Sequence, residues 1–442
     1  MKFFNINILL TIIGLITATS VFAAPEKDFA QVWSSIKSDH PELKSTMEDK
    51  LASDEGASRA FRHWLPSVYL MGRGYATNDP LMNFMGNLGQ RSITNTDFSP
   101  SSLNQPGTSS FAQFGIGANL PLFEGGSSSA MLKMQELDAQ GKSEIYSAKQ
   151  IEIYSQAILS YAGILNSTEA ISEMELLKGR VAAVLSRYSL GSRSNPVGYS
   201  GLLGLKSILN RIEAGLIQLK VEKNTHTSEL RSRSKDLSSE WSVKSEKTGR
   251  FLSLFLPESA IRSNSDSHSM VAANARAESM ASKVTMKRAM FLPQVGLFAD
   301  GNYLLGDRSG ASSYVGGVYL RWSLFDPKAF GAVSEERHLK NSAEFQVQNS
   351  RINENNMRIA SEASLVAILE SEKILLSSTE LMNEQVSTAT KLFQSGAINA
   401  LQLVEVLNRR ADLIQELKKL NDSHIAVRTG LAKISNLKGI EL

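Results

Sequence analysis

The clearest periodic pattern along the chain is a seam of apolar residues near its C-terminal end. Its members follow one another at intervals of 3, 7, 4, 3, 7, 4 and 3 positions: Leu403, Val406, Leu413, Leu417, Leu420, Val427, Leu431 and Ile434. This spacing predicts a helix whose apolar seam packs against a partner helix in a left-handed supercoil.

Two long stretches without proline, 125–190 and 328–395, carry a helical pattern of apolar residues. As straight helices of roughly 66 to 68 residues they would be on the order of 100 Å long, far beyond the ~10–14 residues of an ordinary globular helix. Gly191 and Gly396 follow the two stretches, and a glycine after an apolar turn is typical of a helix C-terminus. We therefore predict that each long helix reverses there into an antiparallel partner.

Four short segments alternate between apolar and polar residues and predict strands: 67–75, 111–120, 295–301 and 314–322. Lengths near ten match tilted membrane strands, although half-buried hairpins of a soluble domain fit the alternation equally well. Four strands cannot close a barrel, and lipid does not tolerate open sheet edges. A sheet that crosses a membrane would therefore have to be shared among several chains.

The chain contains an internal duplication. The words that begin at His40 and Leu65 recur 227 positions later, the word that begins at Gly115 recurs 202 positions later, and the word that begins at Tyr188 recurs 205 positions later. Three markers in the same order indicate two structural repeats. The first copy carries about 25 additional residues within 77–110, and their Asn, Ser, Gly and Pro content predicts a long loop.

The N-terminus resembles a secretory signal. Lys2 precedes the largely apolar run Ile6–Ile16, and Val21-Phe22-Ala23 matches the small-x-small cleavage pattern. We predict a signal peptide at 1–23. A transmembrane anchor is the alternative, but the apolar run has only about half of the ~20 residues that a spanning helix needs.

Composition narrows the function further. The 442 residues include no cysteine and carry a net charge of +3, so neither thiol chemistry nor a nucleic-acid partner is expected. The six histidines are scattered, and no HExxH, P-loop or GxSxG motif occurs. We predict no enzyme activity, no catalytic residues, no cofactor and no metal site.

The duplicated words resemble those of the TolC family of outer-membrane efflux channels over essentially the whole mature chain. They are His40-Pro41-Glu42-Leu43, Leu65-Pro66-Ser67-Val68, Leu120-Pro121-Leu122-Phe123-Glu124-Gly125-Gly126, Phe291-Leu292-Pro293-Gln294-Val295 and Trp322-Ser323-Leu324-Phe325-Asp326, with the turns at Gly191 and Gly396. The resemblance implies a mainly α fold with a small β part. Long antiparallel coiled-coil helices and four strands per chain would build a homotrimer, with a 12-stranded outer-membrane β-barrel and a periplasmic α-helical tunnel.

The same resemblance implies a domain plan and a function. Residues 1–23 would be the signal peptide, 24–240 the first repeat, 241–266 an equatorial connector and 267–442 the second repeat. In a Gram-negative envelope the channel would passively conduct the substrates of a tripartite efflux or type I secretion system. Its partners would be a periplasmic adaptor protein, an inner-membrane pump and outer-membrane lipid.

The resemblance also assigns candidate site residues. Gln402 and Glu405, six and nine positions after Gly396, match the acidic residues that line the periplasmic gate of many relatives. Gln402 is a departure, because it carries no charge. The adaptor-contact candidates are the residues of the two tip turns: Tyr188, Gly191, Arg193, Phe393 and Gly396. Pro196, directly after the first turn, is a second departure.

An adhesive or structural coiled-coil protein of the cell surface is the alternative. It would account for the apolar seam and the signal peptide, but not for paired alternating strands that recur with the same flanking words.

Overall fold

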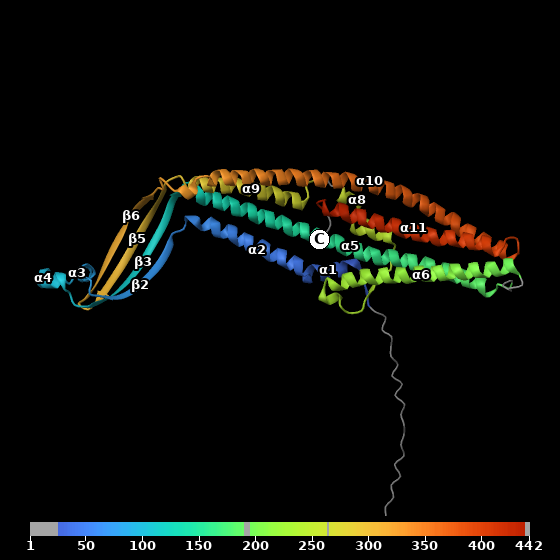
Figure 1. Ribbon diagram of the computed structural model, residues 1–442, viewed down its shortest axis with the longest axis horizontal. Helices are drawn as coiled ribbons and strands as arrows, with labels where there is room; N and C mark the ends of the chain where they lie inside the picture. Colours follow the sequence, from blue (N-terminus) through green and yellow to red (C-terminus); the bar gives the residue numbers. More distant parts are fainter. Residues whose placement is uncertain (1–24, 190–194, 263–264, 438–442) are drawn as a thin grey trace, which may run out of the picture.

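The computed structural model describes residues 25–189, 195–262 and 265–437. The predicted signal peptide and the tip residues Gly191 and Arg193 lie outside these ranges. The chain is elongated, with a β-sheet at one end and helices that run from it to the opposite end (Figure 1). The two halves of the predicted duplication contribute equally to both parts.

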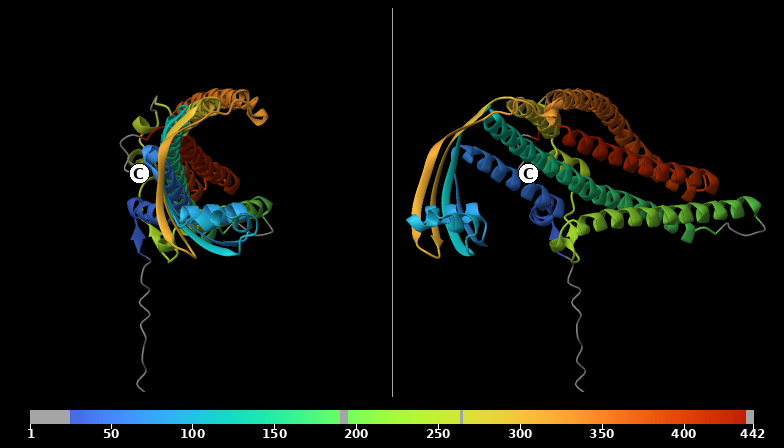
Figure 2. Two further views of the ribbon diagram at one scale, coloured as in Figure 1. Left: turned by 90° about the vertical axis from the view of Figure 1, so that its left-hand side faces the viewer. Right: turned by 60° about the vertical axis from the view of Figure 1, so that its left-hand side comes forward.

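The sheet contains four antiparallel strands in the order β2-β3-β5-β6. The strands are β2 (Ser67–Thr77), β3 (Ser109–Glu124), β5 (Gln294–Gly306) and β6 (Gly310–Arg321). All four predicted strands are confirmed, and each repeat supplies two. The sheet is curved (Figure 2), and its two outer strands, β2 and β6, have no strand partner on their outer edges within the described residues.

The two faces of the sheet differ in chemistry. Over the four strands, one face carries no charged residue and exposes large apolar side chains: Val68, Leu70, Phe114, Ile116, Leu297, Tyr303, Leu305, Tyr314, Val318 and Leu320. Leu70 is 83% exposed and Tyr314 is 92% exposed. The other face carries every charged strand residue together with most of the amides. The alternation predicted from the sequence is therefore confirmed as one apolar and one polar face.

Four long helices form two antiparallel hairpins. The first hairpin is α5 (Ser127–Ser186) and α6 (Pro196–Ser232), and the second is α10 (Ala332–Gln394) and α11 (Ala400–Lys433). The 60 residues of α5 and the 63 of α10 correspond to about 90 Å each at 1.5 Å per residue. No described helix is both long and apolar enough to cross a membrane.

Glycines with positive φ begin both long helices. Gly126 has φ 84° before α5, and Gly331 has φ 86° before α10. These equivalent positions turn the chain from the sheet region into each helix, in a left-handed conformation that residues with a Cβ rarely adopt. The duplication is thus repeated in the backbone geometry at the start of the two long helices.

Shorter elements lie along the long helices, between the sheet and the middle of the molecule (Figure 1). They are β1 (Glu26–Lys27), α1 (Phe29–Asp39), α2 (Pro41–Phe61), η1 (Arg62–Trp64), η3 (Lys235–Leu237), β4 (Ser242–Val243), α7 (Thr248–Phe255), α8 (Glu258–Ile261), α9 (His268–Ala289) and η4 (Pro327–Ala329). Phe29 of α1 lies edge-on to Tyr154, Tyr161 and Phe251 at centroid distances of 5.3 to 5.5 Å. Tyr161 is fully buried and donates a hydrogen bond to the carbonyl of Lys27 at 3.1 Å. This aromatic core ties α1, α5 and α7 together.

The predicted loop within 77–110 is wrong in one respect. It folds into α3 (Pro80–Gly89), η2 (Asn95–Phe98) and α4 (Pro100–Asn104), a structure that we call the cap. Asp79, Thr94 and Ser99 cap the three helices, and Pro80 and Pro100 occupy their first turns. Some of the Ser and Pro residues that indicated a loop thus begin short helices, as Ser99, Pro80 and Pro100 do.

Candidate functional site

The polar face of the sheet carries four charged strand residues, two of each sign: Arg73, Glu124, Asp300 and Arg321. Tyr69 on β2 donates a hydrogen bond to Asp300 on β5 at 2.5 Å, across the intervening strand β3. Gly117 makes this possible, because a Cβ there would lie 2.3 Å from both partners. Gln113 donates to Asn302 at 3.3 Å on the same face. This face is suited to contact with water, and the opposite one to contact with lipid.

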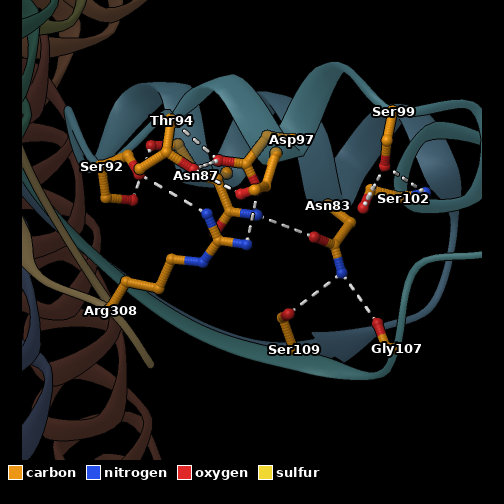
Figure 3. A network of polar contacts seen from close by, with 12 residues as sticks. Asn83, Asn87, Ser92, Thr94, Asp97, Ser99, Ser102, Gly107, Ser109 and Arg308 are labelled. Carbon is orange, nitrogen blue, oxygen red and sulfur yellow. Dashed lines mark hydrogen bonds and ion pairs between the residues drawn. The ribbon is translucent and has the colours of Figure 1, made fainter.

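The cap packs on the polar face at the end of the sheet that is distant from the long helices (Figure 1). Arg308, in the β5–β6 turn, forms an ion pair with Asp97 of η2 at 2.8 Å (Figure 3). The buried Gln90 accepts hydrogen bonds from the backbone N–H groups of Arg308 and Ser309, at 3.2 and 2.9 Å. The cap, which connects β2 to β3, is therefore joined to the β5–β6 turn.

At the opposite end of the subunit, the turn between α10 and α11 is built around Gly396. Its φ is 79°, and the N–H groups of Gly396 and Ala397 bond to the carbonyls of Phe393 and Leu392 at 3.0 and 2.8 Å. This pattern is a glycine-terminated helix end. The predicted reversal after the second long helix is confirmed.

The two helical hairpins touch each other at this tip. Tyr188, after α5, stacks on Phe393 of α10 with ring centroids 5.9 Å apart. A Cβ on Gly201 would lie 2.5 Å from the Cβ of Ala400, so α6 and α11 approach closely there. Three predicted tip residues, Tyr188, Phe393 and Gly396, are therefore brought together, and the half-buried rings of Tyr188 and Phe393 pack against the helical core.

The two gate candidates occupy the first turns of α11. Gln402 forms a capping box with Asn399: its backbone N–H donates to the Asn399 side chain at 2.9 Å, and its own side chain accepts from the Asn399 N–H at 3.0 Å. The side-chain oxygen of Gln402 is thus used to start the helix.

Glu405 has a different environment. Its side chain is 60% exposed and pairs with Arg409, one turn further along α11, at 2.9 Å. The acid of the candidate gate therefore has a cation beside it on the same helix face, and the pair adds no net charge.

Three ion pairs join α11 to the first hairpin, and their most buried members are Arg410 and Lys418. Arg410 is almost fully buried and contacts Glu173 of α5 at 2.6 Å. Lys418 forms an ion pair with Glu222 of α6, and Arg211 of α6 forms one with Asp412. Burial lowers the pKa of Arg410 while Glu173 opposes that shift, and an arginine remains protonated at physiological pH.

The sequence reasoning missed these residues, although the seam contained the signal. Counting by sevens from Leu403 reaches Arg410, Leu417, His424 and Leu431. Arg410 and His424 thus stand at seam positions, and both are buried. Polar residues at a coiled-coil seam fix the register of packing at some cost in stability. No group of three or more metal-ligating side chains comes together among the described residues.

Comparison with known proteins agrees with this geometry. Residues 261–436 match the family model described as outer membrane efflux protein. No curated protein matches the chain.

Solved channel structures share the fold at low sequence identity. The outer membrane protein VceC of Vibrio cholerae is 14% identical with a TM-score of 0.73, over 93% of this chain and 97% of that one. CusC is 12% identical with a TM-score of 0.74, over 93% of each chain. The CmeC outer membrane channel of Campylobacter jejuni is 12% identical with a TM-score of 0.72, over 93% of this chain and 86% of that one. The resemblance predicted from the sequence is confirmed.

The Arg410–Glu173 pair leads to an asymmetric prediction. Glu173→Gln leaves a buried guanidinium without its counter-ion, and we expect it to lower the free energy of unfolding by about 1–3 kcal/mol. Arg410→Met removes the buried charge and leaves the half-exposed Glu173 to water, so we expect a smaller loss or none. Chemical denaturation followed by circular dichroism measures both. Equal losses would contradict the account.

The cap should loosen in acid. The Arg308 side chain, with the backbone and hydroxyl of Thr94, holds the pKa of Asp97 well below its usual range. The stabilisation is therefore fully present above the pKa of unfolded aspartate, about 3.9, and is lost as pH falls towards the lower folded value. We expect amide exchange in 94–98 to accelerate, relative to 150–165, as pH falls below about 4. In the Asp97→Asn variant, amide exchange in 94–98 should be fast already at neutral pH. A cap equally protected in both proteins would contradict this assignment.

Proposed function

Because residues 261–436 match the outer membrane efflux protein family and the fold is that of solved outer-membrane channels, we propose that this chain is one subunit of a homotrimeric efflux channel. The proposal places the sheet in the outer membrane and the helices in the periplasm, after cleavage of a signal peptide at 1–23. Residues 24–240 and 267–442 would be the two repeats, joined by the connector 241–266.

The observation that carries the proposal is the sheet itself. Its apolar face is exposed, its opposite face is polar, and its outer strands β2 and β6 have free edges among the described residues. Lipid does not tolerate unpaired backbone groups. In the order β2-β3-β5-β6, the β6 edge of one copy would run antiparallel to the β2 edge of the next. Three copies of a four-stranded sheet supply the twelve strands of a closed barrel with an apolar outer surface.

The long helices support the remainder of the proposal. Hairpins about 90 Å long, attached directly to the sheet, suit a tunnel that extends from the membrane towards the cell interior. Such a tunnel conducts passively, so the energy would come from an inner-membrane pump through a periplasmic adaptor protein. The cargo would be that of an efflux or type I secretion system.

The helical tip is then the end that meets the adaptor. Tyr188, Phe393 and Gly396, together with Gly191 and Arg193, are the proposed contact residues. Gln402 and Glu405 would surround the pore axis a few residues further in. Because Gln402 is neutral and Glu405 is paired with Arg409, this gate would carry little net charge.

Oligomeric mass tests the proposal. The protein would be purified from detergent-solubilised outer membranes, and its mass measured by light scattering corrected for bound detergent. We expect three subunits and single-channel conductance in planar lipid bilayers. A monomer that stays soluble without detergent would reject the channel and favour the surface coiled-coil alternative.

Ion selectivity tests the gate. In a trimer, Glu405→Gln would leave three Arg409 side chains near the axis, so the reversal potential in a salt gradient should move towards that of an anion-selective pore. Arg409→Gln should move it in the opposite direction. Glu416→Gln, further along α11, is the matched control. Unchanged selectivity in both gate variants would show that Glu405 does not line the constriction.

A further inference from the structure

Helix α3 of the cap is amphipathic, but it buries its polar side and exposes its apolar side. Its buried side is polar, formed by Asn83 and Asn87 and continued by Gln90 just after the helix. Its exposed side is apolar and consists of Leu81, Met85 and Leu88. Leu81 is 70% exposed. A surface helix of a soluble protein normally does the opposite.

The polar side of α3 is hydrogen-bonded within the chain. Asn83 donates to the carbonyl of Gly107 at 2.9 Å and to the Ser109 hydroxyl at 3.0 Å, and it accepts from Asn87 at 2.9 Å (Figure 3). These bonds, with those of Gln90, determine which side of α3 turns inward. The apolar stripe is therefore held outward by specific contacts.

Close contacts locate the cap on the polar face of the sheet. A Cβ on Gly86 would lie 2.4 Å from the ring of Phe111, and a Cβ on Gly89 would lie 2.7 Å from Leu304. Phe111 and Leu304 belong to the same face as Asp300 and Arg73. The stripe Leu81, Met85 and Leu88 is thus directed away from the subunit's own sheet, on the side opposite the apolar face.

On the basis of the proposed channel, we propose that the α3 stripes of neighbouring copies pack against one another across the outer mouth of the pore. If the polar face lines the pore, each stripe faces the region that the caps of the other two copies occupy. The cap also follows directly after β2, which is the edge strand that would pair with the next copy. The stripe therefore lies next to the proposed interface between subunits. The stripe has no charge, so three identical copies that meet on the pore axis would bury apolar surface without bringing like charges together.

This contact gives the cap a role in the channel. Three caps in contact would narrow the outer mouth, and burial of the apolar side chains of Leu81, Met85 and Leu88 would hold them together. Each cap is in turn braced by Gln90 and the Asp97–Arg308 pair. The outer end would then carry a closure independent of the one at the helical tip.

Disulfide cross-linking tests the contact directly, because the chain contains no cysteine. We expect Met85→Cys, oxidised in detergent-solubilised trimers, to form linked dimers on non-reducing gels. The Cα atoms of a disulfide must lie within about 7 Å. Leu70→Cys is the matched control: Leu70 is also apolar and is more exposed than Met85, at 83% against 53%, but it lies on the opposite face of the sheet, and the variant should remain unlinked.

Single-channel conductance is a second measurement, which also detects caps that are in contact only part of the time. Replacing Leu81, Met85 and Leu88 by serine should raise single-channel conductance without changing the trimer mass. If the protein is trimeric and conducts, but cysteines at 81, 85 and 88 all fail to cross-link and the serine variant conducts as the original does, the contact is refuted and the channel stands. A monomeric protein would instead reject the proposed function.

Discussion

The structure depends on one constraint: a curved sheet of four strands with two unsatisfied edges and one face of exposed apolar side chains. The strands β2 and β6 have no outer partner among the described residues, and Leu70 and Tyr314 stand almost fully exposed. In water such a surface would aggregate, and in lipid an open edge would leave backbone groups without partners. Other copies of the same chain are the simplest partners, since the polar and apolar faces would then continue around a closed wall.

The rest of the molecule is organised around that sheet. The glycines Gly126 and Gly331, each with positive φ, direct the chain from the strands into two helices of about 90 Å. Buried charges such as Arg410 and Lys418 then join the second hairpin to the first, where a purely apolar seam would allow the helices to slide. The interface between the hairpins thus combines apolar packing with pairs that define its register.

Much of this architecture was predictable from the sequence because strands and helices each produce a characteristic period of apolar and polar residues. The alternation at 111–120 identified both faces of β3, and the absence of proline in 125–190 and 328–395 indicated the long helices. Four of the eight predicted seam residues, Leu403, Leu413, Leu431 and Ile434, are buried, and the other four are partly buried. Of the candidate site residues, Tyr188, Phe393 and Gly396 meet at the tip, whereas the roles of Gln402 and Glu405 as gate residues remain predictions.

Features that depend on contacts distant in sequence were not predictable. The composition of 77–110 predicts a loop because Asn, Ser and Pro are common to loops and to helix starts, whereas the fold of the cap depends on distant contacts such as that of Gln90 with Ser309. Arg410 is a charged residue at one position of the otherwise apolar seam, and its partner Glu173 lies 237 positions away in the sequence. The apolar side of α3 is exposed because its polar side is buried, and the sequence alone does not show which side faces inward.

The most direct test of the central claim is the structure of the protein in lipid nanodiscs by electron cryo-microscopy. The account predicts three copies in which the β6 edge of each subunit pairs antiparallel with the β2 edge of the next, with Leu70 and Tyr314 facing lipid. A single copy, or an assembly in which these edges stay unpaired or the apolar face is turned inward, would contradict it.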